Sequence, residues 1–116
     1  MAAPALGTDQ FRGNKVRVIA FTQSGANNGD LAAIEPGRAL SSMSFQLTGT
    51  YVAGTVKAQC SNDGSTWADT PTAASLSGLG VKSIAVADLG YRYYRLDFAS
   101  MDAGNTLAGN VVMKFY

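Results

Sequence analysis

Residues 59–67 read Gln-Cys-Ser-Asn-Asp-Gly-Ser-Thr-Trp, and this stretch indicates a β-hairpin. The run Asn62-Asp63-Gly64 lies between two strand-like segments, and residues of these types supply the positive φ angles that a tight hairpin turn needs. Trp67 follows the turn as a large apolar side chain, which we expect to anchor a core. The stretch therefore predicts antiparallel β structure and contains no recognisable catalytic motif.

A second informative stretch, residues 91–98, reads Tyr-Arg-Tyr-Tyr-Arg-Leu-Asp-Phe and alternates with a period of two. Its even-numbered side chains are Arg92, Tyr94, Leu96 and Phe98, and its odd-numbered ones are Tyr91, Tyr93, Arg95 and Asp97. A period of two is typical of a pleated strand. We therefore expect Tyr93, Tyr94 and Leu96 to serve structure and core packing.

Similar alternation recurs along the chain, most cleanly where Met43, Phe45 and Leu47 face one way. The opposite, polar side of that strand consists of Ser42, Ser44, Gln46 and Thr48. No segment has helical periodicity, and about six to eight short strands are separated by glycine-rich turns. This pattern predicts an all-β protein that folds as a single antiparallel β-sandwich and, more finely, as a jelly roll.

The first thirteen residues differ from the rest because they are small, mixed and interrupted by Pro4, Gly7 and Gly13. They suit an extended N-terminal arm better than a regular element, so we place the sandwich domain at residues 14–116. Residues 23–38 form a long loop around a short apolar patch, and loops of this length are often functional. The candidate contacts with a partner are Leu6, Phe11, Arg12, Leu31 and Ile34.

Composition restricts the classes of function. The 116 residues are 47% hydrophobic, which suits one domain with a core of ordinary size. The formal net charge is +1 and no run of like charges occurs, so nucleic acid is not an expected partner. No segment approaches the ~20 apolar residues of a membrane span, and no basic leader region is present. We expect a soluble protein made in a cytosol, without a membrane partner.

The residues of common catalytic sites are scarce. The chain has no His and a single Cys, Cys60, which we expect to be a small buried hydrophobe. Without His, a nucleophile–base relay lacks its usual base. Glu35 is the single Glu, which disfavours the carboxylate pair of a glycosidase. We therefore predict no enzymatic activity, no catalytic residue, no catalytic metal and no cofactor.

Two weaker binding hypotheses stay open. Asp63, Asp69, Asp88, Asp97 and Asp102 carry oxygen ligands of the kind that Ca²⁺ prefers, although turn chemistry accounts for the two in glycine-containing turns. Four aromatic residues are candidates for a sugar-stacking platform, although core packing accounts for most such residues. The four are Trp67, Tyr91, Tyr93 and Tyr94.

The order Ser61-Asn62-Asp63-Gly64, Trp67 and then Tyr91-Arg92-Tyr93-Tyr94-Arg95-Leu96 resembles discoidin-like jelly rolls and small virion proteins of tailed bacteriophages. The resemblance spans about residues 51 to 98. The absence of a signal peptide and of disulfide-forming cysteines favours the bacteriophage side.

The resemblance implies a capsid decoration or cement protein, made in the host cytoplasm and located on the capsid surface of the virion. Such a protein binds the outside of the phage head and stabilises contacts between major capsid subunits. Its expected partners are the major capsid protein, copies of itself as a homo-oligomer, or both. A polar strand face such as that of Ser42 to Thr48 would supply contacts. The alternatives are a phage tail, neck or receptor-binding module, or a carbohydrate-binding module.

Overall fold

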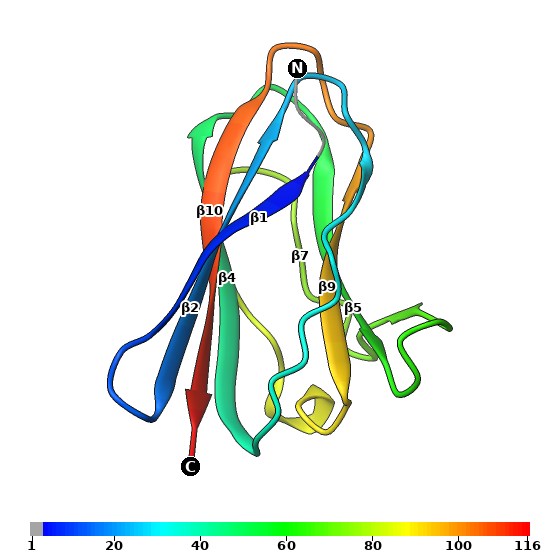
Figure 1. The fold of residues 1–116 in the computed structure, drawn as a ribbon. Helices are drawn as coiled ribbons and strands as arrows, with labels where there is room; N and C mark the ends of the chain where they lie inside the picture. Colours follow the sequence, from blue (N-terminus) through cyan, green and yellow to red (C-terminus); the bar gives the residue numbers. More distant parts are fainter. Residues whose placement is uncertain (1–3) are drawn as a thin grey trace.

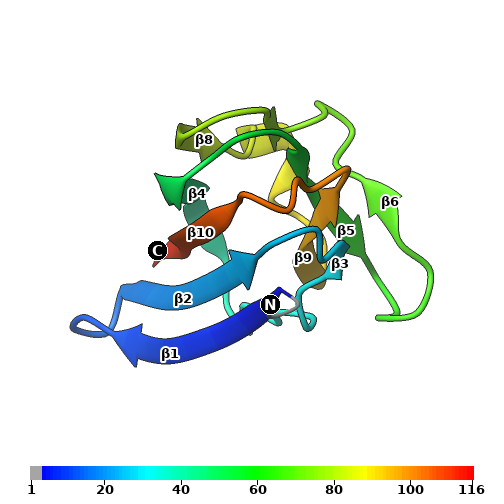
Figure 2. The same cartoon turned by 90° about the horizontal axis from the view of Figure 1, so that it is seen from above.

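The computed structural model describes residues 4–116 as two antiparallel β-sheets packed face to face (Figures 1 and 2). The first sheet contains, in spatial order, β1 (Ala5–Phe11), β2 (Val16–Ser24), β10 (Thr106–Phe115), β4 (Leu40–Thr50) and β8 (Gly80–Ser83). The second contains β3 (Gly29–Asp30), β9 (Tyr93–Ala99), β5 (Thr55–Ser61) and β6 (Ala68–Asp69), with β7 (Ser75–Leu76) also paired to β5. The predicted antiparallel β-sandwich is confirmed, while the jelly roll stays a prediction.

Helical structure is confined, within residues 4–116, to one short 3₁₀ turn, η1 (Val86–Asp88). None of it has the length or the apolar character of a segment that crosses a membrane.

The period-two patterns predicted from the sequence position the core. In the first sheet Val111 of β10 lies opposite Ile19 of β2 and Phe45 of β4, and all three side chains are buried. Met43 and Leu47 are buried on the same side of β4, as predicted. The buried side chains of the second layer include Val56, Ala58, Tyr94, Leu96 and Phe98. The two layers meet where Phe21 packs edge-to-face on Phe98, with ring centroids 5.8 Å apart.

The N-terminal segment differs from its prediction. Residues 5–11 form β1, an edge strand paired with β2, so the expectation that residues 1–13 contain no regular element is wrong. The Arg17 guanidinium forms a bidentate ion pair with the Asp9 carboxylate, with N–O distances of 2.9 and 2.7 Å, and this pair links the two strands. An edge strand forms backbone hydrogen bonds although its side chains bury little surface, so a low apolar content does not exclude a strand. Met1, Ala2 and Ala3 of the predicted arm lie outside the described residues.

The loop between β5 and β6 is wider than the predicted tight hairpin. Gly64 has a φ of +76°, whereas Asn62 and Asp63 do not adopt positive φ. The Ser61 hydroxyl accepts hydrogen bonds from the backbone N–H groups of Asp63 and Gly64 at 3.2 and 2.9 Å. The Asp63 carboxylate accepts two more, from the N–H groups of Ser65 and Thr66, both at 2.8 Å. The side chains of Ser61 and Asp63 therefore stabilise this turn, which indicates a structural role for both residues rather than a catalytic one.

Trp67 does not anchor the core, which corrects the prediction. Its side chain is half-buried at the outer surface of the second sheet, where the Arg95 guanidinium lies 4.3 Å from the ring centroid. Asp69 lies opposite Gln59 on the outer side of the sheet, and Trp67, two residues earlier, points to the same side, so its ring packs on an arginine rather than entering the space between the layers. An indole that packs under a guanidinium gains stabilisation without full burial.

The segment from residue 25 to residue 38 is also more ordered than predicted. Leu31 and Ile34 are 2% and 3% exposed, so the prediction that they contact a partner is wrong. Their N–H groups donate to the carbonyls of Leu96 and Tyr94 in β9, at 3.0 and 2.8 Å. The segment lies along β9 as an irregular extra strand because its two apolar side chains fill the core.

Candidate functional site

The outer faces of the two sheets have opposite chemistry. Since Ile19, Phe45 and Val111 point inward, the neighbouring residues on β2, β4 and β10 point outward. We call these outward residues the uncharged face: Val16, Val18, Ala20, Thr22, Ser42, Ser44, Gln46, Thr48, Ala108, Asn110 and Val112. Lys114 lies at its rim, between Val16 and Ser42. The predicted polar side of residues 42–48 is confirmed and forms one third of this face.

The uncharged face is partly apolar at its middle. Val18, Val112 and Ser44 lie opposite one another in adjacent strands, and all three are half-buried. The hydroxyl of Thr48 donates to the carbonyl of Ala108 at 3.0 Å, so one of the polar groups is already satisfied within the sheet. The face therefore offers small neutral side chains with few strongly hydrated groups.

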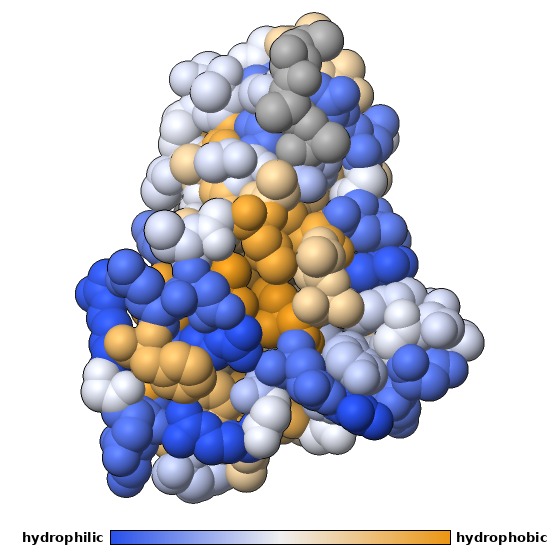
Figure 3. Space-filling view, in the orientation of Figure 1, coloured by the Kyte–Doolittle hydropathy of each residue, from blue (hydrophilic) through white to orange (hydrophobic). Residues whose placement is uncertain are grey.

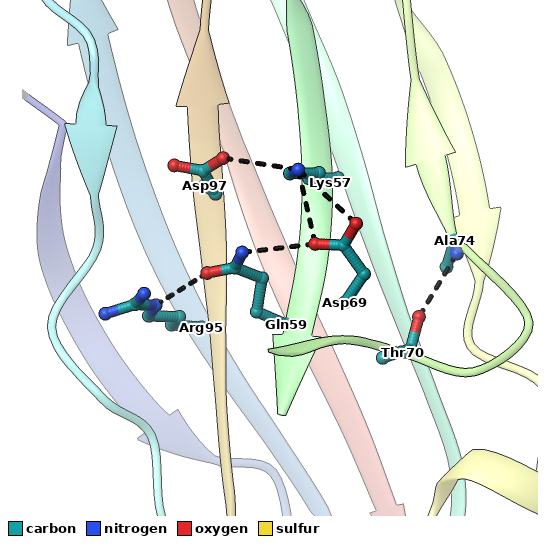
Figure 4. A network of polar contacts seen from close by, with 7 residues as sticks. All are labelled: Lys57, Gln59, Asp69, Thr70, Ala74, Arg95 and Asp97. Atoms are coloured by element: carbon teal, nitrogen blue, oxygen red, sulfur yellow. Dashed lines mark hydrogen bonds and ion pairs between the residues drawn. The ribbon is translucent and has the colours of Figure 1, made fainter. Parts of the chain in front are cut away.

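The outer face of the second sheet carries a network that we call the charged ladder (Figure 4). It consists of Lys57, Gln59, Asp69, Arg95 and Asp97, which Figure 4 shows, together with Asp30. Lys57 lies 3.2 Å from a carboxylate oxygen of Asp69 and 4.0 Å from one of Asp97. Gln59 donates to Asp69 at 3.1 Å and accepts from Arg95 at 2.9 Å. Arg95 also pairs with Asp30 at 3.3 Å, so each cation on this face has a carboxylate partner.

The pKa values of Asp69 and Asp97 are shifted in opposite directions. Hydrogen bonds from Gln59 and Lys57 hold the pKa of Asp69 below its ordinary value. Burial raises the pKa of Asp97, and the neighbouring Asp30 carboxylate raises it further. The pKa shift of Asp69 comes from contacts within the ladder, whereas that of Asp97 comes first from burial and then from Asp30.

The aspartates considered for calcium do not gather at one point. Within residues 4–116, no three Asp, Glu, Cys or His side chains are close enough to hold a metal ion together. Backbone hydrogen bonds from Thr66 and Ser65 lower the pKa of Asp63 to about 2. Asp88 is buried and accepts from the backbone N–H of Thr72 at 2.9 Å, a contact across the fold rather than within its own turn.

The aromatic residues considered for sugar stacking do not form one exposed platform, since the rings of Tyr91 and Tyr94 meet edge-to-face with centroids 6.5 Å apart. Tyr94 is buried, and its hydroxyl donates to the Asp88 carbonyl at 2.6 Å. Burial raises its pKa to about 12. Tyr94 and Leu96 are core residues as predicted, and Cys60 is buried as predicted. Tyr93 is half-buried on the opposite side of β9, with the Arg92 guanidinium 5.1 Å from its ring.

The remaining predicted contacts, Leu6, Phe11 and Arg12, lie on or directly after β1. Leu6 packs partly against the core, whereas Phe11 is 53% exposed and Arg12 is exposed. On the side of the molecule that β1 crosses in Figure 1, apolar surface gathers at the middle with hydrophilic residues on its flanks (Figure 3). The ring of Phe11 stacks on Phe115, with centroids 6.3 Å apart.

One residue of this region was not found from the sequence. The Arg38 guanidinium lies 4.4 Å from the ring centroid of Phe115 and 5.3 Å from that of Phe11. It lines a cleft of about 360 Å³ between residues 35–40 and residues 89–92. No local signal marks Arg38, because its contacts join segments that are distant in the sequence.

Comparisons of this chain with protein-family models, with curated proteins and with solved structures found no match.

Proposed function

We propose that this chain is a non-enzymatic structural protein of a virion, of the capsid decoration or cement type. It attaches to the outside of a phage head through the uncharged face and bridges neighbouring copies of the major capsid protein. The observation that carries the proposal is the contrast between the neutral outer face of the first sheet and the charged ladder on the second.

The physical argument is desolvation. The core of a protein–protein interface is depleted in charged side chains, because a buried charge loses its hydration. Val18, Ala20 and Val112 add apolar area to the uncharged face, and its serine, threonine and amide side chains can exchange water for a partner's polar groups. Many weak, symmetry-related attachments add up on a shell, so no single contact has to be strong.

The edge of the first sheet adds a second means of attachment. β1 has seven residues, whereas the other edge strands, β8, β3 and β6, have four, two and two. An exposed strand edge can pair with an extended segment of a neighbouring chain. Phe11 and Arg12 lie at the end of this edge.

Point substitution is the better test, because a truncation of residues 1–12 would remove β1 and uncover β2. Ser44→Arg places a long charged side chain in the middle of the uncharged face. We expect the protein to stay folded but to lose most of its occupancy on purified particles, and the shell to lose heat resistance. The matched control is Ser65→Arg, in the exposed β5–β6 loop of the other layer, which should bind normally.

Occupancy is measured by quantitative mass spectrometry of purified particles, and location by electron microscopy. Copies repeated over the capsid would support decoration, whereas copies at the tail or neck would support the alternative of a tail, neck or receptor-binding module. Equal occupancy for Ser44→Arg and Ser65→Arg would remove the uncharged face from the proposal, and absence from the particle would contradict the proposal itself.

A further inference from the structure

Arginine–aromatic stacking is repeated in this fold, and one instance differs from the others. Four arginines place their guanidinium groups over aromatic rings. Three of them also hold a carboxylate: Arg17 binds Asp9, Arg92 binds Glu35 and Arg95 binds Asp30. The fourth is Arg38. Within residues 4–116 its guanidinium stacks on two rings and makes no ion pair.

Stacking positions Arg38 without using its hydrogen-bond donors. A guanidinium that lies over an aromatic ring contributes its flat face to the contact, while its N–H groups point outward in its own plane. The rings of Phe11 and Phe115 limit its conformations, so less entropy is lost when a ligand binds. A guanidinium that lies over an aromatic ring and has no carboxylate partner is a suitable receptor for a planar anion, above all for a carboxylate that accepts two parallel hydrogen bonds.

The residues around Arg38 form a cleft that can hold a carboxylate. Residues 35–38 and Leu40 form one wall of the cleft, and Leu89, Tyr91 and Arg92 form the other. The carboxylate of Glu35 is already held by Arg92 at 2.7 Å, so it does not neutralise Arg38. Arg17 donates to the backbone carbonyl of Glu35 at 2.9 Å and fixes the first wall against β2. The cleft is therefore preformed, with an excess of positive charge and an apolar contribution from two leucines and a tyrosine.

We propose that this cleft binds a carboxylate group carried by a peptide segment of a partner protein, with Arg38 as the principal ligand. The carboxylate lies in the plane of the Arg38 guanidinium, and its short apolar stem contacts Leu40, Leu89 and the Tyr91 ring. The inference goes beyond the proposed attachment to a capsid, since the residues that line the cleft are not part of the uncharged face and the binding of a carboxylate does not depend on which assembly the protein joins.

The test is an NMR titration of the isotopically labelled full chain with short blocked peptides. The probe is acetyl-Gly-Glu-Gly-amide, and acetyl-Gly-Gln-Gly-amide is its neutral counterpart. We expect saturable shifts of the Arg38 Nε–H signal and of the Gly37 and Tyr91 amides with the glutamate peptide alone. A third peptide, acetyl-Gly-Gly with a free C-terminal carboxylate, distinguishes a side-chain carboxylate from a chain terminus as the group that is bound.

Two variants make the assignment specific. Arg38→Gln should weaken binding of the glutamate peptide by about tenfold or more, because the two charge-assisted hydrogen bonds are lost. Lys82→Gln removes the same charge from β8, outside the cleft, and should change the affinity by less than about twofold. If Arg38→Gln does not fold, Arg38→Lys keeps the charge but not the planar fork, and should still weaken binding several-fold.

Three results would overturn the inference. They are equal shifts with the glutamate and glutamine peptides, equal affinity for Arg38→Gln and Lys82→Gln, and no saturable shift at Arg38 and Tyr91 up to about 20 mM peptide, a concentration that detects even millimolar affinities. Since the titration uses the isolated protein, its outcome is separate from occupancy on a particle.

Discussion

The two sheets of this sandwich carry different kinds of side chains on their outer surfaces. The second sheet covers its outer surface with the charged ladder, in which lysine, arginine, glutamine and aspartate side chains satisfy one another. On the outer surface of β2, β4 and β10 the first sheet carries neutral side chains, with Lys114 at the rim. Regular alternation therefore decides which side chains point outward, but it does not decide whether the outward face is neutral or charged.

The sheets also differ in how their strands are held together. In the first sheet β10 lies between β2 and β4, and an added Cβ at Gly109 would meet the Gln46 carbonyl and the Phe21 ring. In the second sheet β5 and β9 are linked across the outer surface by the Gln59–Arg95 contact. The strands of the first sheet are therefore held together by close packing, whereas those of the second sheet are also linked by contacts between outward-pointing side chains.

The largest expected effect is on the first sheet. In Gly109→Ala the new methyl group would clash with the carbonyl of Gln46 and would lie 2.7 Å from Cζ of Phe21. We expect the free energy of unfolding to fall by about 3 kcal/mol, as for other overpacked sites, measured by urea denaturation. Gly78→Ala is the control, because nothing lies within 4 Å of the added atom. A Gly109→Ala protein within about 0.5 kcal/mol of the parent, inside the usual range of a neutral surface change, would contradict the close packing.

A smaller effect is expected at the loop that closes the second sheet. Gly64→Val forces a β-branched residue to a φ of +76°, which should cost about 1–3 kcal/mol in a thermal or urea melt. Backbone strain, rather than a clash, is the reason, since the nearest atom of the Tyr93 ring lies an ordinary 3.5 Å from the added carbon. Ser65→Val, one residue on, has no positive φ to adopt and should be nearly neutral. Equal melts for the two variants would mean that this turn does not constrain the fold.

The smallest effect is expected on the charged ladder. Lys57→Gln should cost about 0.5 kcal/mol, because partly exposed ion pairs contribute little. Carboxyl NMR titration gives the sharper readout. The pKa of Asp97 should rise further above its ordinary value, and the lowered pKa of Asp69 should rise, since Lys57 lowers both. Unchanged pKa values at both residues would show that the ladder is not formed in solution.

The sign of the pH dependence follows from these directions. A carboxyl group with a raised pKa in the folded state opposes folding once it is ionised, and this cost disappears as the pH falls through the folded pKa. Asp69 behaves in the opposite way: its contribution is present above the unfolded pKa and is lost as the pH falls through the lowered folded pKa. In Lys57→Gln the cost from Asp97 should grow and the gain from Asp69 should shrink, so stability at neutral pH should fall relative to acidic pH.

Individual elements show where sequence reasoning succeeded. The strand at residues 42–48 was predicted with its correct buried and exposed sides, because alternation acts within one segment and needs no knowledge of its neighbours. The buried positions of Tyr94 and Leu96 followed from the same rule. At residues 62–64 the position of the turn is predicted correctly, but its length is not. The hydrogen bonds that the Ser61 and Asp63 side chains accept from the backbone compete with a tight hairpin.

The errors share a cause, which is pairing between separate segments of the chain. The surroundings of Leu31 and Ile34 are typical of a loop and predict contact with a partner, yet carbonyl groups of β9 accept their backbone hydrogen bonds. The apolar character of Trp67 predicts a core position, yet Arg95 lies over its ring. The composition of residues 5–11 predicts an extended arm, yet the ion pair of Asp9 with Arg17 holds them to β2. The deciding contact lies eight residues away for Asp9 and farther along the chain for the others.

By itself, then, the sequence determined the fold class, the inward and outward sides of its regular strands and the position of its main turn, because these follow from local periodicity and backbone preference. Only the tertiary structure decided that one outer face is neutral and the other a charged ladder, and that Arg38 lies over Phe11 and Phe115 with no carboxylate partner among residues 4–116. These features join strands that are far apart in the chain, and no local pattern records which strands become neighbours.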